Sequence, residues 1–253
     1  MLRQQRQHEI LNRLGSAGGV RVAELAKALK VTEETIRRDL EQLDAEGKLR
    51  RTHGGAVPTQ ENGRNPSFDV RKVTNLEQKV AIARTAAPAI REGDVIGLDV
   101  STTTYELAQI IPDIPLTVIT NSVPVVLALM SRTHVRVVST GGDFDSRARS
   151  FTGSLAEQAL SRFNINKLFL SSKGVDLSRG LSDATDSQAR VKRAMMDIAE
   201  ETCLLADHSK FGQRSVVFFA GLDEIDRVIT NAGVDEAVLR DLSTAVKSVE
   251  TAE

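Results

Sequence analysis

Two kinds of hydrophobic spacing divide the chain. In the amino-terminal part, apolar residues recur every three or four positions, as in Ile36, Leu40 and Leu43, which is typical of one face of an α-helix. From residue 76 onward, short β-branched runs such as 116–119 alternate with helical stretches. The sequence therefore predicts an α/β protein, in which a small helical domain precedes a doubly wound, mostly parallel sheet with helices on both faces.

The amino-terminal part predicts three helices and a β-hairpin. A first helix ends near Gly15, a second lies within 22–29, and a third begins after Thr32, a good helix N-cap. The basic stretch 48–57 indicates two short strands around a glycine turn. Two helices joined by a short turn and followed by such a hairpin are typical of a winged helix-turn-helix, whose second helix enters the major groove of DNA.

Basic side chains gather where such a fold meets DNA. Arg37 and Arg38 lie in the first two turns of the third helix, and a planar guanidinium group grips phosphates or guanine edges. A small helical bundle with a solvated charged face is the alternative, but it leaves the basic hairpin unexplained. The predicted contacts to double-stranded operator DNA are Thr32, Thr35, Arg37, Arg38, Arg50, Arg51 and His53.

Composition changes this picture in one respect. The 253 residues carry a formal net charge of -1, which by itself argues against a nucleic-acid partner. However, residues 1–57 hold 11 Lys and Arg against 8 Asp and Glu, a net charge of +3, whereas the remainder holds 22 against 26, a net charge of -4. The basic surplus thus lies in the part with the DNA-binding pattern. Because one such domain gives little specificity, a homo-oligomer, either a dimer or a tetramer, is expected.

Cellular context follows from what the sequence lacks. Cys203 is the single cysteine, so no intrachain disulfide can form, and its apolar neighbours indicate a buried thiol. The first twenty residues lack the apolar segment of a signal peptide, and no stretch is long and apolar enough for a membrane span. We therefore expect a cytoplasmic protein with no membrane partner.

A polar stretch separates the two patterns. Residues 58–75 are rich in polar residues, Gly and Pro before helical periodicity resumes, which is typical of an interdomain connection. The predicted organisation is a winged helix-turn-helix domain at 1–57, a linker at 58–75, and a ligand-sensing and oligomerisation domain at 76–253.

Polar residues follow the apolar runs of the predicted sheet. Ligands of such sheets bind beyond the carboxyl ends of the strands, so these loops form a candidate site. The run 101–104 places hydroxyl and backbone N–H groups at a helix N-terminus, where anions bind, and Lys173 and Lys210 suit a phosphate. A single such loop is more often a helix cap, but five together favour a phosphorylated polar ligand. The candidate ligand-binding residues are Asp99, Ser101, Thr102, Thr103, Asn121, Ser122, Gly141, Gly142, Lys173, Gly174, Asp176, Asp186, Asp207, Ser209 and Lys210.

Several of these segments resemble one family. The segments 22–26, 35–40 and 53–56 resemble the DNA-binding signature of the DeoR family of bacterial repressors. The loops at 99–103 and 207–212 resemble the sensor domain of that family, which is itself similar to ribose-5-phosphate isomerase. The resemblance implies a repressor of a carbohydrate-utilisation operon, controlled by a phosphorylated sugar or related metabolite. Ser101, Ser171 and Lys173 depart from the residues usual in the family, so the effector can differ from the family norm.

The main alternative is a sugar-phosphate isomerase with an appended DNA-binding domain. Asp186 is a conceivable base for enediol chemistry, but the glycine-rich lysine loop of the isomerase is missing between Asp176 and Asp186. The sequence contains no zinc-binding pattern, nucleophile elbow or Walker loop. A scaffold without a ligand would leave the polar loops unexplained. We therefore expect a regulator that is not an enzyme and that uses no cofactor or metal.

Overall fold

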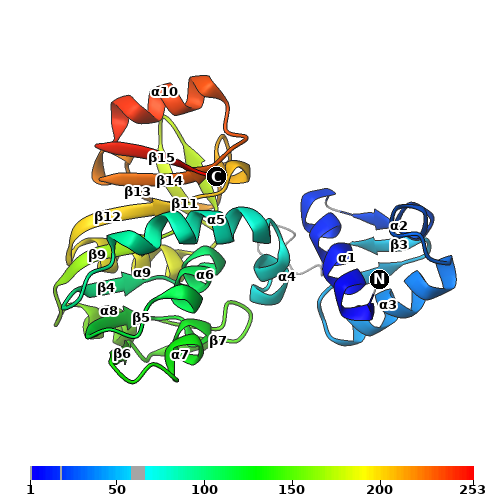
Figure 1. Ribbon diagram of the computed structural model, residues 1–253, viewed down its shortest axis with the longest axis horizontal. Helices are drawn as coiled ribbons and strands as arrows, with labels where there is room; N and C mark the ends of the chain where they lie inside the picture. Colours follow the sequence, from blue (N-terminus) through cyan, green and yellow to red (C-terminus); the bar gives the residue numbers. More distant parts are fainter. Residues whose placement is uncertain (1, 18, 58–65) are drawn as a thin grey trace. The chain divides into compact units, whose positions relative to one another are not determined.

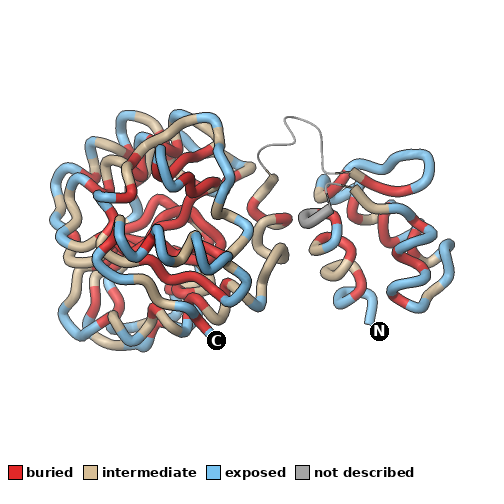
Figure 2. The backbone as a smooth tube through the Cα atoms, turned by 90° about the horizontal axis from the view of Figure 1, so that it is seen from above, coloured by how far each residue is buried: buried red, intermediate tan, exposed pale blue. Residues whose placement is uncertain are grey.

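The structure, a computed structural model, describes residues 2–17, 19–57 and 66–253. It divides into two compact units, Met1–Leu76 and Glu77–Glu253 (Figure 1). Each unit has a hydrophobic core of its own, and Figure 2 shows buried segments running through the interior of both.

The first unit combines helices with a small antiparallel sheet. Its helices pack through the predicted apolar positions, and Ile36, Leu40 and Leu43 lie buried against Ile10 and Leu14. Removing these side chains from water is the main stabilising contribution to the unit. Its elements are α1 (Arg3–Ala17), β1 (Val20–Arg21), α2 (Val22–Leu29), α3 (Glu33–Ala45), β2 (Arg50–Thr52), β3 (Gly55–Val57) and α4 (Phe68–Val73).

The predicted hairpin is present as β2 and β3, and β1 adds a third strand beside β3. The sequence pattern does not indicate β1, because two residues are too few to show a period. Gly55 permits this pairing, since a Cβ atom at that position would lie 1.9 Å from the carbonyl oxygen of Val20. The helices and the three-stranded wing together confirm the predicted winged helix-turn-helix.

The segment predicted as a linker is not uniform. Residues 58–65 lie outside the described part of the chain, but Phe68–Val73 forms helix α4, which packs on α1 and buries Val70 in the core of the first unit. Beyond α4, the backbone N–H of Asn75 donates to Asn12 Oδ1 at 3.2 Å. The second half of the predicted linker therefore belongs to the first unit.

The second unit is built on a parallel sheet. Its strands follow the order β15-β14-β12-β9-β4-β5-β6, and the described pairings within this sheet are all parallel. Helices α5, α6 and α7 contribute to one hydrophobic cluster and α8, α9 and α10 to another, so both faces are covered (Figure 1). This arrangement confirms the predicted α/β fold. The elements are α5 (Leu76–Ala86), β4 (Val95–Leu98), α6 (Thr102–Ile110), β5 (Leu116–Thr120), α7 (Val123–Leu129), β6 (Val135–Ser139), α8 (Ser154–Leu160), β9 (Ile165–Leu170), α9 (Asp186–Met196), β12 (Ala199–Leu205), β14 (Arg227–Asn231), α10 (Glu236–Ala245) and β15 (Ser248–Ala252).

Two smaller sheets lie outside the main one. A hairpin pairs β7 (Asp143–Asp145) with β8 (Ser150–Thr152), and a second antiparallel sheet joins β10 (Gly174–Asp176), β11 (Gly180–Asp183) and β13 (Val217–Ala220). Within the ranges described above, no helix has the length and apolar character that crossing a bilayer requires.

Candidate functional site

Helix α3 begins with the predicted cap. The Thr32 hydroxyl oxygen accepts the backbone N–H of Thr35 at 3.2 Å, which satisfies one of the open donors at the helix start. One turn further on, Arg37 pairs with Glu33 at 2.6 Å and Arg38 with Glu34 at 3.2 Å, all of them exposed. Exposed pairs of this kind contribute only about 0.3–0.5 kcal/mol, so both arginines can exchange their partners for DNA at little cost.

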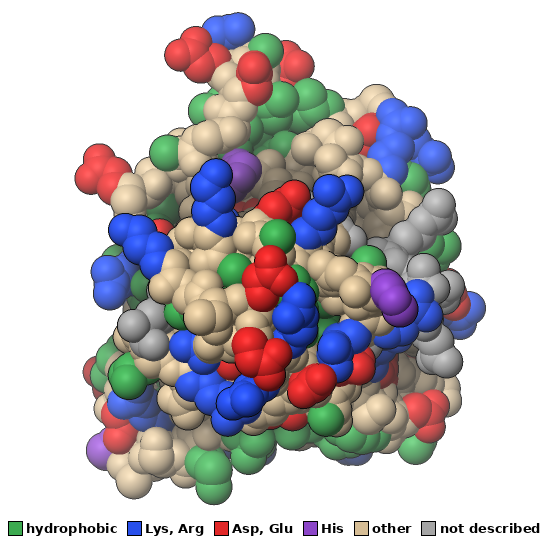
Figure 3. Space-filling model, turned by 90° about the vertical axis from the view of Figure 1, so that its right-hand side faces the viewer, with side chains coloured by type: hydrophobic (Ala, Val, Ile, Leu, Met, Phe, Trp, Pro, Cys, Tyr) green, Lys and Arg blue, Asp and Glu red, His purple; other side chains and the backbone are tan. Residues whose placement is uncertain are grey.

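The wing lies next to this helix. Arg50, Arg51 and His53 are exposed on β2 and the following turn, and Arg51 reaches Glu41 of α3 at 2.7 Å. The predicted DNA contacts therefore occupy two adjoining elements of one unit. Figure 3 shows Lys and Arg side chains interleaved with acidic ones on the face turned to the viewer rather than in one uninterrupted positive patch.

A buried ion pair holds α3 against α1. Arg6 donates to both carboxylate oxygens of Asp39, and Arg3 approaches the same carboxylate at 3.6 Å. Asp39 is 1% exposed. The Asp39 side chain therefore supports the recognition helix from behind and is not available to DNA.

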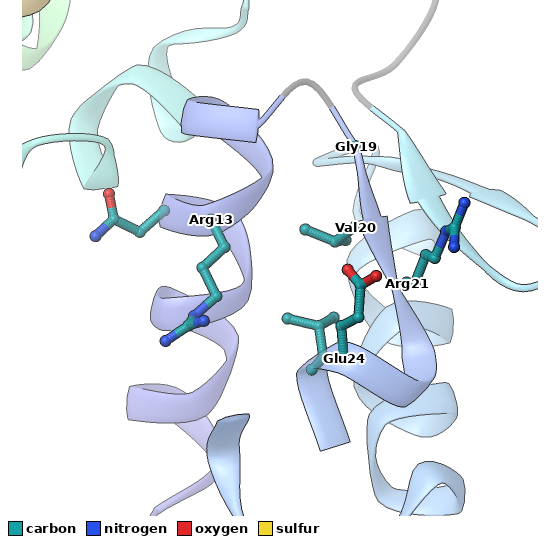
Figure 4. Close-up of a pocket in the computed structure, with 7 residues that line it drawn as sticks. Arg13, Gly19, Val20, Arg21 and Glu24 are labelled. Atoms are coloured by element: carbon teal, nitrogen blue, oxygen red, sulfur yellow. The ribbon is translucent and has the colours of Figure 1, made fainter. Parts of the chain in front are cut away.

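A pocket of the first unit lies between α1 and the β1–α2 segment (Figure 4). None of the predicted DNA contacts lines it. Arg13 on its α1 side pairs with Glu9 at 2.7 Å, and Asn12 accepts the Asn75 N–H. The lining residues are Asn12, Arg13, Gly19, Val20, Arg21, Glu24 and Leu25.

In the second unit, Asp99 lies at the point where the strand order reverses. β4 is central, β5 and β6 extend the sheet on one side, and β9 and later strands extend it on the other. Such a switch point is where open α/β sheets bind ligands. Asp99 directly follows β4 there, and its Oδ2 accepts the backbone N–H of Ser171, which follows β9, at 3.2 Å.

Asp99 is fully engaged by its own protein. Its Oδ1 accepts the Ser101 N–H and the Thr104 hydroxyl, each at 3.0 Å, and its Oδ2 also accepts the ammonium of Lys192. Four donors fill the acceptor capacity of a carboxylate. Burial alone would raise the pKa of Asp99, but Lys192 and the Ser101 donors hold it below its ordinary value. Asp99 is thus a positioning residue that fixes Ser101 and the first turn of α6.

Lys192 extends from α9 into this site, and sequence reasoning did not include it among the site residues. Its side chain is 4% exposed and also donates to the Ser171 carbonyl at 2.6 Å. Asp183 lies 3.5 Å from the same ammonium group. The buried cluster of Asp99, Asp183 and Lys192, which we term the buried triad, carries one more negative than positive charge.

The structure does not bring Asp186 to this cluster. Asp186 lies in the first turn of α9 with its side chain 62% exposed, and it pairs with Arg190 at 2.7 Å. Asp183, three residues earlier at the end of β11, occupies the inward position instead. Asp186 therefore does not belong to the buried triad, and its contact with a ligand stays a prediction.

Three polar atoms near the switch point retain binding capacity. Among the described residues, Asn121 Oδ1, Gln188 Oε1 and Ser172 Oγ are buried without a hydrogen-bond partner. The Asn121 amide N–H donates to the carbonyl oxygen of Phe151 at 3.0 Å, and since a carbonyl only accepts, the free Oδ1 must be an acceptor. Gln188 Nε2 bonds Ser150 at 2.9 Å and lies one turn before Lys192 on α9. Buried acceptors of this kind require a donor to avoid a penalty of about 1–3 kcal/mol.

The other predicted ligand residues divide into two groups. Ser101 caps α6 and Ser122 caps α7, while Thr102 and Thr103 lie buried in the first turn of α6. Gly142 has a φ of 112°, and a Cβ atom at this position would lie only 2.5 Å from the carbonyl oxygen of Thr152. These residues and Gly141 follow β4, β5 and β6 at the same sheet edge. The remaining group, which follows β9 and β12 or lies in β10, contains Lys173, Gly174, Asp176, Asp207, Ser209 and Lys210.

Within the second group, the two carboxylates differ. Asp176 accepts the Ser178 hydroxyl at 2.7 Å and Arg214 at 2.5 Å, and these bonds hold its pKa far below the ordinary value. It therefore closes a turn. Asp207 is 1% exposed beside Ser209, with Lys210 Nζ at 3.8 Å; burial would raise the pKa of Asp207, but Lys210 and the Ser209 hydroxyl keep it lowered.

Comparison with known proteins identifies the domain family of both parts of the chain. Residues 6–61 match the DeoR-like helix-turn-helix domain, and residues 74–232 match the DeoR C terminal sensor domain. The chain belongs to the DeoR family. It is 44% identical to the uncharacterized HTH-type transcriptional regulator YulB of Bacillus subtilis, and the aligned region covers 96% of this chain and 94% of that protein.

Two further relatives have named roles. The L-fucose operon activator of Haemophilus influenzae is 37% identical, covering 90% of this chain and 91% of the relative, and the transcriptional repressor AccR of Agrobacterium fabrum is 35% identical, covering 91% and 90%. Because the DeoR family and these relatives are regulators, the protein is a DNA-binding transcriptional regulator. The alternative of a sugar-phosphate isomerase is therefore rejected. Ribose 5-phosphate isomerase A of Methanocaldococcus jannaschii is similar at 16% identity and a TM-score of 0.40, covering 55% of each chain.

The residues missed by sequence reasoning share one property. Asp183, Gln188 and Lys192 are polar side chains buried by the fold. Gln188 bonds Ser150, 38 residues away, and Lys192 bonds Asp99, 93 residues away. Gln188 and Lys192 carried a faint signal, since both fall on the apolar side of an amphipathic helix, four residues apart with Val191 and Met195.

Proposed function

We propose that this DeoR-family regulator represses a carbohydrate-utilisation operon and that a phosphorylated sugar or related metabolite controls its operator affinity. α3 and the wing contact the operator, with Arg37 and Arg38 at base edges or phosphates. The protein acts as a homo-oligomer, because paired recognition helices read two half-sites and thereby gain specificity.

The observation that carries the effector proposal is the pair of unpartnered acceptors. Asn121 Oδ1, in the loop after β5, and Gln188 Oε1, on α9, are buried without a hydrogen-bond partner, and a donor such as a ligand hydroxyl satisfies them. Lys173 and Lys210 supply positive charge in the loops after β9 and β12, which suits a phosphate. A ligand with hydroxyls at one end and a phosphate at the other therefore fits both halves of the site.

The relatives support regulation of sugar genes but include both an activator and a repressor, so repression by this protein is part of the proposal. One relative is named an activator of the L-fucose operon and another a repressor. We expect that deleting the gene raises transcription of its target operon, as measured with a reporter fusion. A fall in transcription would make the protein an activator.

A two-step experiment tests effector control. First, ribose 5-phosphate, fructose 6-phosphate, glucose 6-phosphate and their unphosphorylated sugars are screened for a rise in melting temperature, because a ligand that binds the folded state stabilises it. Second, each hit is added to an operator-binding assay with DNA upstream of the regulated genes. We expect a hit to weaken operator binding and to lose its effect in Lys210→Ala, while Arg190→Ala, which changes an exposed pair, responds normally.

Three results would contradict the proposal. A hit that leaves operator affinity unchanged would separate ligand binding from regulation. A normal response in Lys210→Ala would remove Lys210 from the site. Rapid conversion of the added sugar phosphate into a product would restore the enzyme alternative.

A further inference from the structure

Helix α7 is apolar around its whole circumference. Between Ser122 and Ser131 the sequence is VPVVLALM, without a charged or amide side chain. Helices of this kind are normally buried on all sides. In the second unit only one side of α7 is buried, where Val125 and Leu129 enter the core, whereas Leu127 is 59% exposed and Met130 is 75% exposed.

The neighbouring helix extends this surface. α6 packs beside α7, and the guanidinium of Arg132 donates to the Gln109 carbonyl at 3.3 Å, which ties the carboxyl ends of the two helices together. Ile110, the next residue, is 39% exposed at that same end. Ile110, Leu127 and Met130 form what we term the α6–α7 face. Exposed apolar surface of this kind marks an interaction site.

We propose that the α6–α7 face is the surface through which two copies of this chain associate about a two-fold axis. The inference rests on the proposed homo-oligomer and adds the residues that build it. In a two-fold interface the same patch meets itself, so the patch must be complementary to itself. An apolar face meets this requirement, whereas a face of one charge repels its copy.

Charge and position on the sheet favour a second copy as the occupant. Ile110, Leu127 and Met130 are all uncharged, so the side chains that define the face do not repel their copies when the face meets itself. α7 packs on β6, the edge strand of the main sheet, which places the face at the outer end of one layer, where a second molecule can reach it (Figure 1). A seven-residue helix is far shorter than the roughly 20 residues that span a bilayer, so a lipid occupant is a poor fit.

The function also calls for such a pairing. Each chain supplies one recognition helix, and a two-fold operator is read by two of them. An interface at the α6–α7 face uses no residue of α3 or of the wing. Polar residues from the loops around the face must complete the contact, because stable interfaces bury about 800 Å² on each partner.

Engineered cysteines test the surface directly. Cys203 is the single cysteine, and burial raises the pKa of its thiol to about 12, so it does not compete for a maleimide. We expect Leu127→Cys to be joined into covalent dimers by a short bis-maleimide. Val216→Cys is the matched control, since Val216 is 60% exposed and lies beside β13 of another sheet. Equal cross-linking of the two variants would overturn the proposal.

Sedimentation of the full chain gives an independent answer. We expect the wild type and Val216→Glu to sediment as dimers or larger assemblies, and Leu127→Glu and Met130→Glu to sediment at the monomer mass of 27.5 kDa. Both residues are exposed, so the variants should keep the wild-type unfolding transition. An unchanged mass in both glutamate variants would show that the interface lies elsewhere, which would overturn the assignment of the α6–α7 face but not the proposed homo-oligomer. A monomeric wild type would refute both, while the operator and effector assays still test the rest of the proposed function.

Discussion

Removing the charge of Lys192 should destabilise the second unit far more than removing any surface charge. In Lys192→Met, the carboxylates of Asp99 and Asp183 remain buried at 1% and 4% exposure without their ammonium partner. Breaking a buried ion pair from one side costs about 3–5 kcal/mol, because the remaining charge is left uncompensated. A domain has only about 5–15 kcal/mol of stability, so this is a large fraction of the total.

The same helix offers a matched control. Arg190 pairs with Asp186 on the exposed side of α9, with both side chains more than 60% exposed. Arg190→Ala should cost about 0.3–0.5 kcal/mol, roughly a tenth of the Lys192→Met effect. The double variant Asp99→Asn/Lys192→Met should lose less than the sum of its single variants, because it removes both charges of the closest pair.

A specific probe for this unit exists in the sequence. The chain has no tryptophan and one tyrosine, Tyr105, which lies on α6 three residues after the start of that helix. Tyrosine fluorescence therefore follows unfolding of the second unit in urea, whereas far-ultraviolet circular dichroism follows both units. Comparing the two signals also shows whether the units unfold together.

The pH dependence of the Lys192→Met stability loss tests the electrostatic role of Lys192. In the wild type, the pKa of Asp99 is lowered, so the stability that this group contributes is present above pH 3.8 and is lost as pH falls through the lowered pKa. Without Lys192, burial dominates and the pKa of Asp99 rises above 3.8, so ionised Asp99 becomes destabilising and the deficit of Lys192→Met should shrink as pH falls toward 4. A deficit below about 1 kcal/mol, or one that does not change with pH, would refute the electrostatic role of Lys192.

Three further predictions concern other parts of the chain. Arg37→Ala and Arg38→Ala should each weaken operator binding by about 1–3 kcal/mol if they read bases, measured by fluorescence anisotropy; unchanged affinity in both would remove them from the interface. Gly55→Ala should destabilise the wing by more than about 1 kcal/mol because its Cβ meets the Val20 carbonyl, whereas Gly54→Ala, with open space around it, should stay within about 0.5 kcal/mol in a urea titration. Backbone N–H groups of His134 and Thr133 lower the pKa of Asp113 to about 2. The contribution of Asp113 to stability is therefore present above pH 3.8 and is lost between pH 3.8 and about 2. In an acid titration, Asp113→Asn should lose less stability over this range than the wild type, and identical profiles would exclude this role.

Much of the fold could be predicted because the buried parallel strands contain short apolar runs. Val95–Leu98 is such a run, and Arg227–Asn231 contains the apolar pair Val228 and Ile229; the alternation of these runs with helical stretches indicates the α/β order. The small sheets could not be predicted in this way. β7 reads Asp-Phe-Asp and β10 reads Gly-Val-Asp, and segments so short become strands only because a partner strand lies beside them.

The DNA-binding surface was easier to predict than the ligand site for a related reason. Thr32, Arg37 and Arg38 lie within seven residues, so helical spacing alone places them near one another; in the structure Thr32 caps α3, and Arg37 and Arg38 lie on that helix. The ligand site draws on loops after several strands and on α9. Lys192 looks like an ordinary helix lysine until the fold brings Asp99 to it from 93 residues away.

A polar residue at the carboxyl end of a strand can serve a ligand or serve its own loop, and its hydrogen bonds separate the two roles. Asp99 has no remaining acceptor capacity, since each of its carboxylate oxygens receives two hydrogen bonds from the protein. Asp176 receives three hydrogen bonds on Oδ1 and one, from Arg214, on Oδ2. Asn121 and Gln188 each use the amide nitrogen to fix the side chain and leave the oxygen unsatisfied. A change at Asp99 should therefore alter the stability of the site first, whereas changes at Asn121 and Gln188 should alter which hydroxyl-bearing ligands it accepts.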